Sequence, residues 1–230
     1  VLDTVYQPID YSKTFEEAPF KYPQDEKVAF MTFDDGVSEY TQTILDVLKQ
    51  ANARATFFVK GERKVHGEDL FKRIYEEGHL IAAHSYSHTY HTIYASLDAY
   101  YDDLERIRDL IYDSTGVRTL YYRFAGGSNA SYCPVYLRRQ IVDEGKKRGY
   151  THFDWNIDSK DWTDPAPTPY QVYKTVIKQS YNYTQPIILL HDMRKSTAEA
   201  LPAIIDGLIE AGYKLDTLDK RHTAVQFVKE

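Results

Sequence analysis

The sequence has almost no cysteine: Cys133 is the only one in 230 residues. A single thiol excludes an internal disulfide and a metal site built from several thiolates. Long apolar runs are also missing, and none approaches the ~20 residues that cross a bilayer. We therefore expect no membrane insertion within this chain.

Positive charge is scarce as well. The chain has 28 lysines and arginines against 34 aspartates and glutamates, and its net charge is −6 at pH 7. A surface that binds nucleic acid needs a basic excess, so we expect no nucleic-acid partner. Neutral or cationic substrates fit this charge better.

The apolar content, at 43%, is sufficient for one sizeable core. Residues 1–26 mix polar, aromatic and proline residues without a sustained hydrophobic period, which predicts an extended N-terminal segment. We expect residues 27–230 to form a single folded domain.

Short apolar runs alternate with amphipathic runs from residue 27 onward, which is typical of repeated strand–helix units. The expected strands are residues 28–33, 55–59, 80–84, 120–124, 152–157, 187–191 and 214–218. The expected helices are residues 41–50, 70–77, 97–112, 135–148, 170–181 and 198–211. This alternation predicts a parallel sheet covered by helices, either closed as a barrel or open.

Local signals mark several helix ends. Gly78, Gly149 and Gly212 each stand just before an expected strand, where a glycine commonly ends the preceding helix. Ser196 and Glu199 have the spacing of a capping box, which predicts the start of the last helix.

Polar side chains gather where the expected strands end. They are Asp34 and Asp35 after the first strand, His84 after the third, Arg123 in the fourth, Asp158 and Asp161 after the fifth, and His191 in the sixth. The carboxyl ends of parallel strands meet at one rim, and function usually lies there. The remaining histidines show no such grouping and are expected to be structural: His66, His79, His91, His152 and His222.

Two of these groups suggest a metal site. Two adjacent carboxylates, Asp34 and Asp35, repel unless one binds a cation and the other stays free as a base. His84 and His88, four residues apart, can be aimed at a single point by one helical turn or by a tight loop. Two imidazoles and one carboxylate leave positions open for water and substrate, as in catalytic zinc sites.

Five ordered motifs resemble those of the polysaccharide deacetylases, carbohydrate esterase family 4. They are Thr-Phe-Asp-Asp-Gly at 32–36, His-Ser-Tyr-Ser-His at 84–88, Arg-Phe-Ala-Gly-Gly at 123–127, Asp-Ser-Lys-Asp-Trp at 158–162 and Leu-Leu-His at 189–191. The resemblance runs from residue 27 to about residue 218. It implies that residues 27–230 are a catalytic domain with the α/β fold of a distorted, incomplete (β/α)7-type barrel, preceded by the N-terminal extension.

The resemblance also implies roles for particular residues. Asp35, His84 and His88 would bind a divalent metal, with zinc expected first and cobalt or nickel as alternatives. Asp34 would be the base and His191 the acid.

Further residues would support these roles. Arg123 would orient Asp34, and Asp158 would be the partner of His191. Trp162, Leu189 and Gly126 are predicted to contact the substrate, the first two as apolar walls for the acetyl methyl group, with plain core packing as the alternative for these two. The third motif departs from the family pattern, because Ala125 stands where a proline is usual, and this leaves the loop that carries Arg123 less constrained.

The activity implied is metal-dependent hydrolysis of acetyl groups on an acetylated polysaccharide or oligosaccharide. N-acetyl groups of N-acetylglucosamine in peptidoglycan or chitin-like glycans are expected first, and O-acetyl groups of acetylated xylan are the alternative. Such substrates imply an extracellular or cell-surface location, with no signal or anchor in these residues, and we expect a monomer.

Two readings outside this chemistry stay open. Two histidines and one carboxylate can hold iron(II) for oxygen chemistry, but that design does not explain Asp34 or an acid at His191. The chain could also be an inactive glycan-binding domain that keeps the metal. Asp34 and His191 argue against that reading, and Ala125 is the one feature in its favour.

Overall fold

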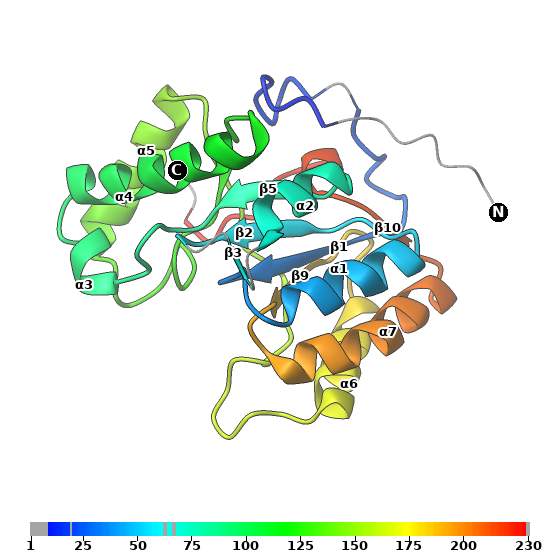
Figure 1. The fold of residues 1–230 in the computed structure, drawn as a ribbon. Coiled ribbons are helices and arrows are strands. Elements are labelled where there is room, and N and C mark those ends of the chain that lie inside the picture. Colours follow the sequence, from blue (N-terminus) through cyan, green and yellow to red (C-terminus); the bar gives the residue numbers. More distant parts are fainter. Residues whose placement is uncertain (1–8, 19, 62–63, 66–67, 229–230) are drawn as a thin grey trace.

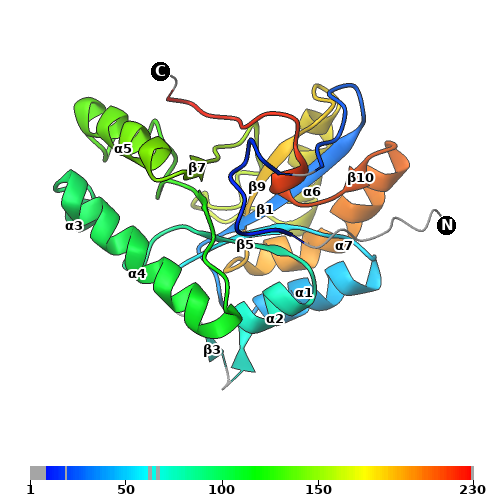
Figure 2. The same ribbon diagram turned by 90° about the horizontal axis from the view of Figure 1, so that it is seen from above.

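One curled parallel sheet lies at the centre of the molecule, and helices surround its outside (Figures 1 and 2). The computed structural model describes residues 9–228 apart from residues 19, 62–63 and 66–67. The buried apolar side chains of the described residues form one core cluster, as in a single domain.

The sheet has eight strands, in the order β7-β6-β5-β2-β1-β9-β8, and β10 pairs with β1. Their bounds are β1 Val28–Asp34, β2 Thr56–Val59, β5 Leu80–Ala83, β6 Tyr121–Tyr122, β7 Thr151–His152, β8 Ile157–Asp158, β9 Ile187–His191 and β10 Lys214–Leu215. All of these pairings are parallel. Every residue of β1 is buried, as expected for a strand with neighbours on both sides and helices outside.

The sheet curls because its two edge strands are consecutive in the chain. Strand β7 is at one edge and β8 at the other, and residues 153–156 join them. Five steps of extended chain from His152 to Ile157 span at most about 18 Å, so the edges must approach each other. The expected incomplete (β/α)7-type barrel is therefore confirmed.

The same connection corrects one expected strand. Residues 152–157 were predicted to be a single strand, but the backbone changes partner within them. Phe153 N–H donates to Tyr122 of β6, whereas Asn156 N–H donates to Ile187 of β9. Phe153 and Ile157 are both buried, as their apolar side chains predicted. They belong, however, to two short stretches of chain that pair with opposite edges of the sheet.

The six expected helices are present, and a short seventh, α3, was not expected. The bounds are α1 Thr41–Gln50, α2 Leu70–Glu76, α3 Tyr90–Ile93, α4 Leu97–Thr115, α5 Val135–Lys147, α6 Pro169–Ser180 and α7 Lys195–Glu210. A 3-10 turn, η1, covers Leu218–Lys220, and a small antiparallel hairpin pairs β3 Lys64–Val65 with β4 Glu68–Asp69.

The predicted capping box was wrong. Helix α7 begins at Lys195, with Arg194 as its N-cap and no side-chain cap, so Ser196 already lies inside the helix. The helix ends predicted from glycines are confirmed. Gly78, Gly149 and Gly212 follow α2, α5 and α7, with φ of 79°, 73° and 86°. A left-handed residue at these points lets the chain leave each helix and re-enter the sheet.

The described part of the N-terminal segment forms turns and extended chain, and it packs on the same core as the sheet. Tyr11, Phe15 and Tyr22 are buried. The Tyr11 hydroxyl accepts a hydrogen bond from the N–H of Ile81 in β5 (3.1 Å), and the Tyr22 hydroxyl donates to Asp216 (2.8 Å). The segment therefore contributes apolar surface to the domain core.

Candidate active site

The site lies at the carboxyl ends of the central strands. Asp34 ends β1 and is paired in register with His191 at the end of β9. His84 follows β5 directly. Parallel pairing therefore brings a carboxylate and two imidazoles to one rim.

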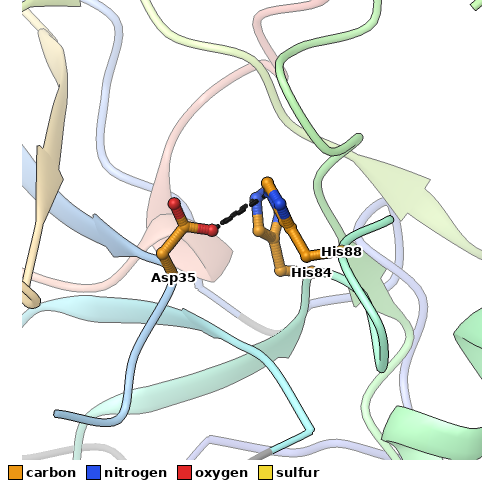
Figure 3. A group of neighbouring side chains, drawn as sticks. All are labelled: Asp35, His84 and His88. Carbon is orange, nitrogen blue, oxygen red and sulfur yellow. Dashed lines mark ion pairs between the residues drawn. The ribbon is translucent and has the colours of Figure 1, made fainter. Parts of the chain in front are cut away.

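Asp35, His84 and His88 come together just beyond this rim. Asp35 Oδ1 is 3.6 Å from His84 Nε2 and 3.1 Å from His88 Nε2. Figure 3 shows the carboxylate facing the two imidazoles, which lie side by side. Asp35 has a φ of 71°, and this turn aims it at the imidazoles although its neighbour Asp34 leaves the strand elsewhere.

The two histidines are held by a tight loop and not by a helical turn. The Asp103 carboxylate of α4 accepts hydrogen bonds from the Ser85 hydroxyl (2.6 Å) and from the N–H groups of Tyr86 (2.7 Å) and Ser87 (2.9 Å). The Ser85 hydroxyl in turn accepts from the N–H of His88 (2.8 Å). Asp103 thus fixes the backbone that sets the spacing of the two rings.

The donor set fits a divalent cation. His84 Nδ1 lies 3.0 Å from the carbonyl oxygen of Arg123, which can only accept, so Nδ1 carries the proton and Nε2 presents its lone pair. Burial lowers the pKa of His84 and of His88 to about 4, which keeps both rings neutral near pH 7. Among the described residues, the buried Oδ1 of Asp35 accepts no hydrogen bond. Two neutral imidazoles and one unsatisfied carboxylate oxygen, within 4.8 Å of one another, are suitable ligands.

The charge of Asp35 agrees with that role. Burial alone would raise the pKa of this carboxyl, but His84, His88 and Lys60 outweigh burial and lower it. Asp35 is therefore ionised, as a metal ligand must be.

Asp34 is held by Arg123 in a buried ion pair. The guanidinium Nη1 donates to Asp34 Oδ1 at 2.7 Å and to the Thr32 hydroxyl at 2.7 Å. Its other nitrogens donate to the carbonyl oxygens of Phe153 (2.9 Å) and Asp154 (3.1 Å). Burial raises the pKa of Asp34, and the charge of Arg123 opposes this rise. The hydrogen bond from Arg123 also fixes the direction of the carboxylate.

His191 is held by Asp161 on its Nδ1 side. The Nδ1 to Asp161 Oδ1 distance is 2.7 Å, and Asp161 Oδ2 accepts from the His191 backbone N–H (2.7 Å) and from the Thr197 hydroxyl (2.6 Å). Burial would lower the pKa of His191, but the hydrogen bond and charge of Asp161, helped by Asp34 and Asp35, raise it to about 9. His191 is thus protonated near pH 7 and can donate from Nε2.

The expected partner of His191 was therefore wrong by three residues. Asp158 accepts instead from the amino group of Lys160 (2.7 Å) and from the indole N–H of Trp162 (3.1 Å). Lys160 has a φ of 63°, so the chain turns between the two aspartates, and it is Asp161 that points to the barrel interior.

The Asp158→Asn variant should leave the basic limb of the pH–rate profile where it is in the wild type, because Asp158 does not contact His191. A shift of that limb to lower pH would restore Asp158 as the partner.

The three expected substrate contacts differ in position. Trp162 is 48% exposed beside the site, whereas Leu189 is nearly buried in β9. Gly126 has a φ of 79°, and a Cβ there would lie 3.5 Å from the Tyr90 hydroxyl and 3.7 Å from the Tyr132 ring. Their contacts with substrate stay predictions.

Hydrogen bonds constrain the loop at Ala125, where the family pattern usually has a proline. The Ala125 carbonyl accepts a hydrogen bond from the buried Tyr94 hydroxyl at 2.7 Å, and the Gly127 N–H closes a turn on Phe124 at 2.9 Å. With Arg123 making four hydrogen bonds of its own, the loop is constrained without the proline.

Asp192, the residue after His191, was not among the site residues predicted from the sequence. Asp192 is fully buried and accepts from the Thr41 hydroxyl (2.6 Å), and its carbonyl accepts from the Ser38 hydroxyl (2.6 Å). Its carboxylate lies against Gly36, where a Cβ would be only 1.9 Å from Oδ2. The loop that carries Asp35 is therefore fastened to the residue after His191, and only glycine fits at position 36.

An open cleft of about 320 Å³ adjoins Asp35. Lys60, Tyr86 and Met193 are among its lining residues. Lys60 follows β2 and lies 3.9 Å from Asp35, so a cation also stands at this rim. A site open to solvent beside the cluster can admit a large substrate.

Comparison with known proteins agrees with these features. The family model for polysaccharide deacetylases matches residues 21–152. A peptidoglycan-N-acetylglucosamine deacetylase of Bacillus cereus is 33% identical over 224 residues, 95% of this chain and 79% of that protein. A peptidoglycan-N-acetylmuramic acid deacetylase of Bacillus subtilis is 31% identical over 223 residues, 93% of this chain and 81% of that protein.

A solved structure extends the likeness to three dimensions. The catalytic domain of a peptidoglycan N-acetylglucosamine deacetylase from Eubacterium rectale superposes with a TM-score of 0.85 at 31% identity, covering 94% of this chain and 99% of that one. The match includes the curled parallel sheet whose strand ends carry the site. With its matched sequence, shared fold and five motifs at one rim, the chain belongs to the polysaccharide deacetylases, carbohydrate esterase family 4.

Proposed function

We propose that this protein hydrolyses the N-acetyl groups of N-acetylglucosamine residues in peptidoglycan. The observation that carries the proposal is the pairing of two separately held groups across β1 and β9. Asp34 is aimed by Arg123, and His191 is aimed by Asp161, in register on neighbouring strands. A base and an acid so placed can act on two sides of one acetyl group.

Asp35, His84 and His88 would hold the metal. A bound divalent cation polarises the acetyl carbonyl and makes water a better nucleophile. We propose zinc, because this ligand set suits it, with cobalt and nickel as alternatives.

The protein's own groups would then move two protons. Asp34 takes one from the attacking water, while Arg123 opposes the rise in the pKa of Asp34 that burial causes and directs its carboxylate. As the carbon–nitrogen bond breaks, protonated His191 gives a proton from Nε2 to the leaving amine. Asp161 stabilises the imidazolium until that transfer, and the products are acetate and a glucosamine residue.

The choice of glycan rests on the relatives' names, two of which specify N-acetylglucosamine in peptidoglycan and one N-acetylmuramic acid. A peptidoglycan substrate would place the protein outside the cell or at its surface. We propose that it acts there as a monomer.

A panel of acetylated glycans tests the choice. We expect acetate release from peptidoglycan and from chitin-derived oligosaccharides, and at least tenfold less from acetylated xylan. Acetate should be measured enzymatically, together with free amine, because only N-deacetylation yields both. Release from xylan alone would replace this proposal by an O-acetyl esterase.

The same panel addresses the inactive alternative. Asp34, Arg123, Asp161 and His191 are all in hydrogen-bonded position, which supports turnover. Binding of the glycans without any acetate release, in metal-loaded protein, would instead indicate a glycan-binding domain.

A further inference from the structure

Four tyrosines form a column that runs from the core to the surface beside His88, one of the proposed metal ligands. Tyr100 and Tyr94 are stacked at 5.9 Å with rings 15° apart, and Tyr94 and Tyr90 at 6.4 Å and 9°. Tyr90 and Tyr132 are stacked at 4.3 Å with rings 3° apart, which is the closest contact of the column. The rings are thus nearly parallel from end to end.

Exposure changes steeply along this column. Tyr100 and Tyr94 are buried and Tyr90 is half-buried, but Tyr132 is 59% exposed. Tyr90 covers one face of the Tyr132 ring, and no other aromatic ring or cation of the described residues stacks on it. The column therefore presents one open aromatic face to solvent.

Hydrogen bonds from Arg138 hold the loop that carries Tyr132. Arg138 of α5 donates to the carbonyl oxygens of Cys133 (2.7 Å) and Ala130 (2.5 Å), one on each side of Tyr132. The Ala130 N–H closes a turn on Gly127 (3.1 Å), so this loop continues from the third motif. A ring fixed in this way loses little freedom when it binds a ligand.

The column also touches the site. The Tyr90 ring lies 5.2 Å from the ring of His88. Tyr132 is therefore two ring contacts, of 5.2 and 4.3 Å, away from a proposed metal ligand. A sugar next to the acetylated one would reach the exposed ring.

From this geometry, and resting on the proposed function, we propose that Tyr132 is a sugar-binding subsite that stacks on the apolar face of the neighbouring pyranose. The face of an aromatic ring is electron-rich and packs well against the C–H groups of a flat, neutral ring. Such a subsite would select for oligosaccharides over single sugars and would need no charge. It binds the glycan through the ring and not through the hydroxyl.

The chain offers a matched control. Tyr136, four residues further on, is 66% exposed, and no described ring stacks on it. If any exposed tyrosine near α5 improved glycan binding, Tyr132→Ala and Tyr136→Ala would act alike. The subsite predicts that only Tyr132→Ala has an effect.

The experiment compares kcat and KM for tetra-N-acetylchitotetraose and for the small ester 4-nitrophenyl acetate. Tyr132→Ala should raise the tetramer KM at least fivefold and change kcat less than threefold, with a much smaller effect on the ester. Tyr132→Phe should resemble the wild type, and Tyr136→Ala should change neither constant. An unchanged tetramer KM in Tyr132→Ala, or an equal loss on both substrates, would overturn the subsite.

A binding measurement separates this proposal from the proposed function. Calorimetric titration of the tetramer into the Asp34→Asn variant, with and without Tyr132→Ala, requires no turnover. Weaker binding in the double variant supports the subsite even if wild-type protein releases no acetate, whereas equal binding refutes it even if acetate is released. Tyr132→Leu repeats the test with an apolar side chain that has no ring, in case Tyr132→Ala disturbs the fold, and we expect the same loss.

Discussion

The Asp35→Asn variant is expected to bind no divalent metal and to be inactive, whereas Asp34→Asn should keep its metal and lose catalysis by about two to four orders of magnitude. The two residues are neighbours, but their surroundings differ. Asp35 faces two imidazole nitrogens at 3.1 and 3.6 Å, while Asp34 is paired with Arg123 at 2.7 Å. The variants should look alike in an acetate-release assay and opposite in elemental analysis.

Arg123→Ala is the internal control for this pair. It removes the cation that aims Asp34 but no proposed ligand, so it should retain metal and resemble a milder Asp34→Asn. If Asp34→Asn empties the site while Asp35→Asn leaves it filled, the two roles are exchanged. If both variants remain active, neither carboxylate takes part in the reaction.

The second large effect is expected at His191. His191→Ala should lower kcat by about two to four orders of magnitude without loss of metal, because the imidazole supplies a proton and not a ligand. Elemental analysis alongside kinetics checks this. A variant that loses both metal and activity would make His191 a ligand.

Asp161→Asn tests the same acid through pH. The rate should fall as the pH rises through the pKa of His191, since only the protonated ring can donate. Burial lowers that pKa, but Asp161, helped by Asp34 and Asp35, raises it to about 9, so removing the charge of Asp161 lowers the pKa and moves the basic limb of the profile to lower pH. Asp158→Asn is the matched control three residues away, and an unshifted profile in Asp161→Asn would detach this carboxylate from the acid.

Much of the site could be predicted because the ends of the strands can be located from the sequence. Apolar runs mark parallel strands, parallel strands converge at their carboxyl ends, and polar residues just beyond them must meet. Asp34, His84 and His191 follow from that rule alone. This rule does not predict loop conformations, and the wrong partner for His191 was predicted in a loop.

The choice between Asp158 and Asp161 shows the limit. Both follow the same expected strand, and a left-handed Lys160 between them decides which one turns inward. Lysine rarely adopts that conformation, so no local preference announces it. The role of Asp103 could not be predicted for a different reason. Helix α4 carries several charged residues, and the sequence does not distinguish Asp103 from those that face solvent, because its hydrogen bonds to the loop at Tyr86 become apparent only in the structure.

Gly36 and Asp192 impose a mechanical restriction on the enzyme. The carboxylate of Asp192 fills the space that a side chain at position 36 would need, and the hydrogen bonds of Asp192 with Ser38 and Thr41 tie the segment after β1 to the end of β9. We therefore expect the gap between Asp34 and His191 to change little when different glycans bind. We expect discrimination among acetylated polymers to arise instead from segments outside this pair, such as the one around Tyr132.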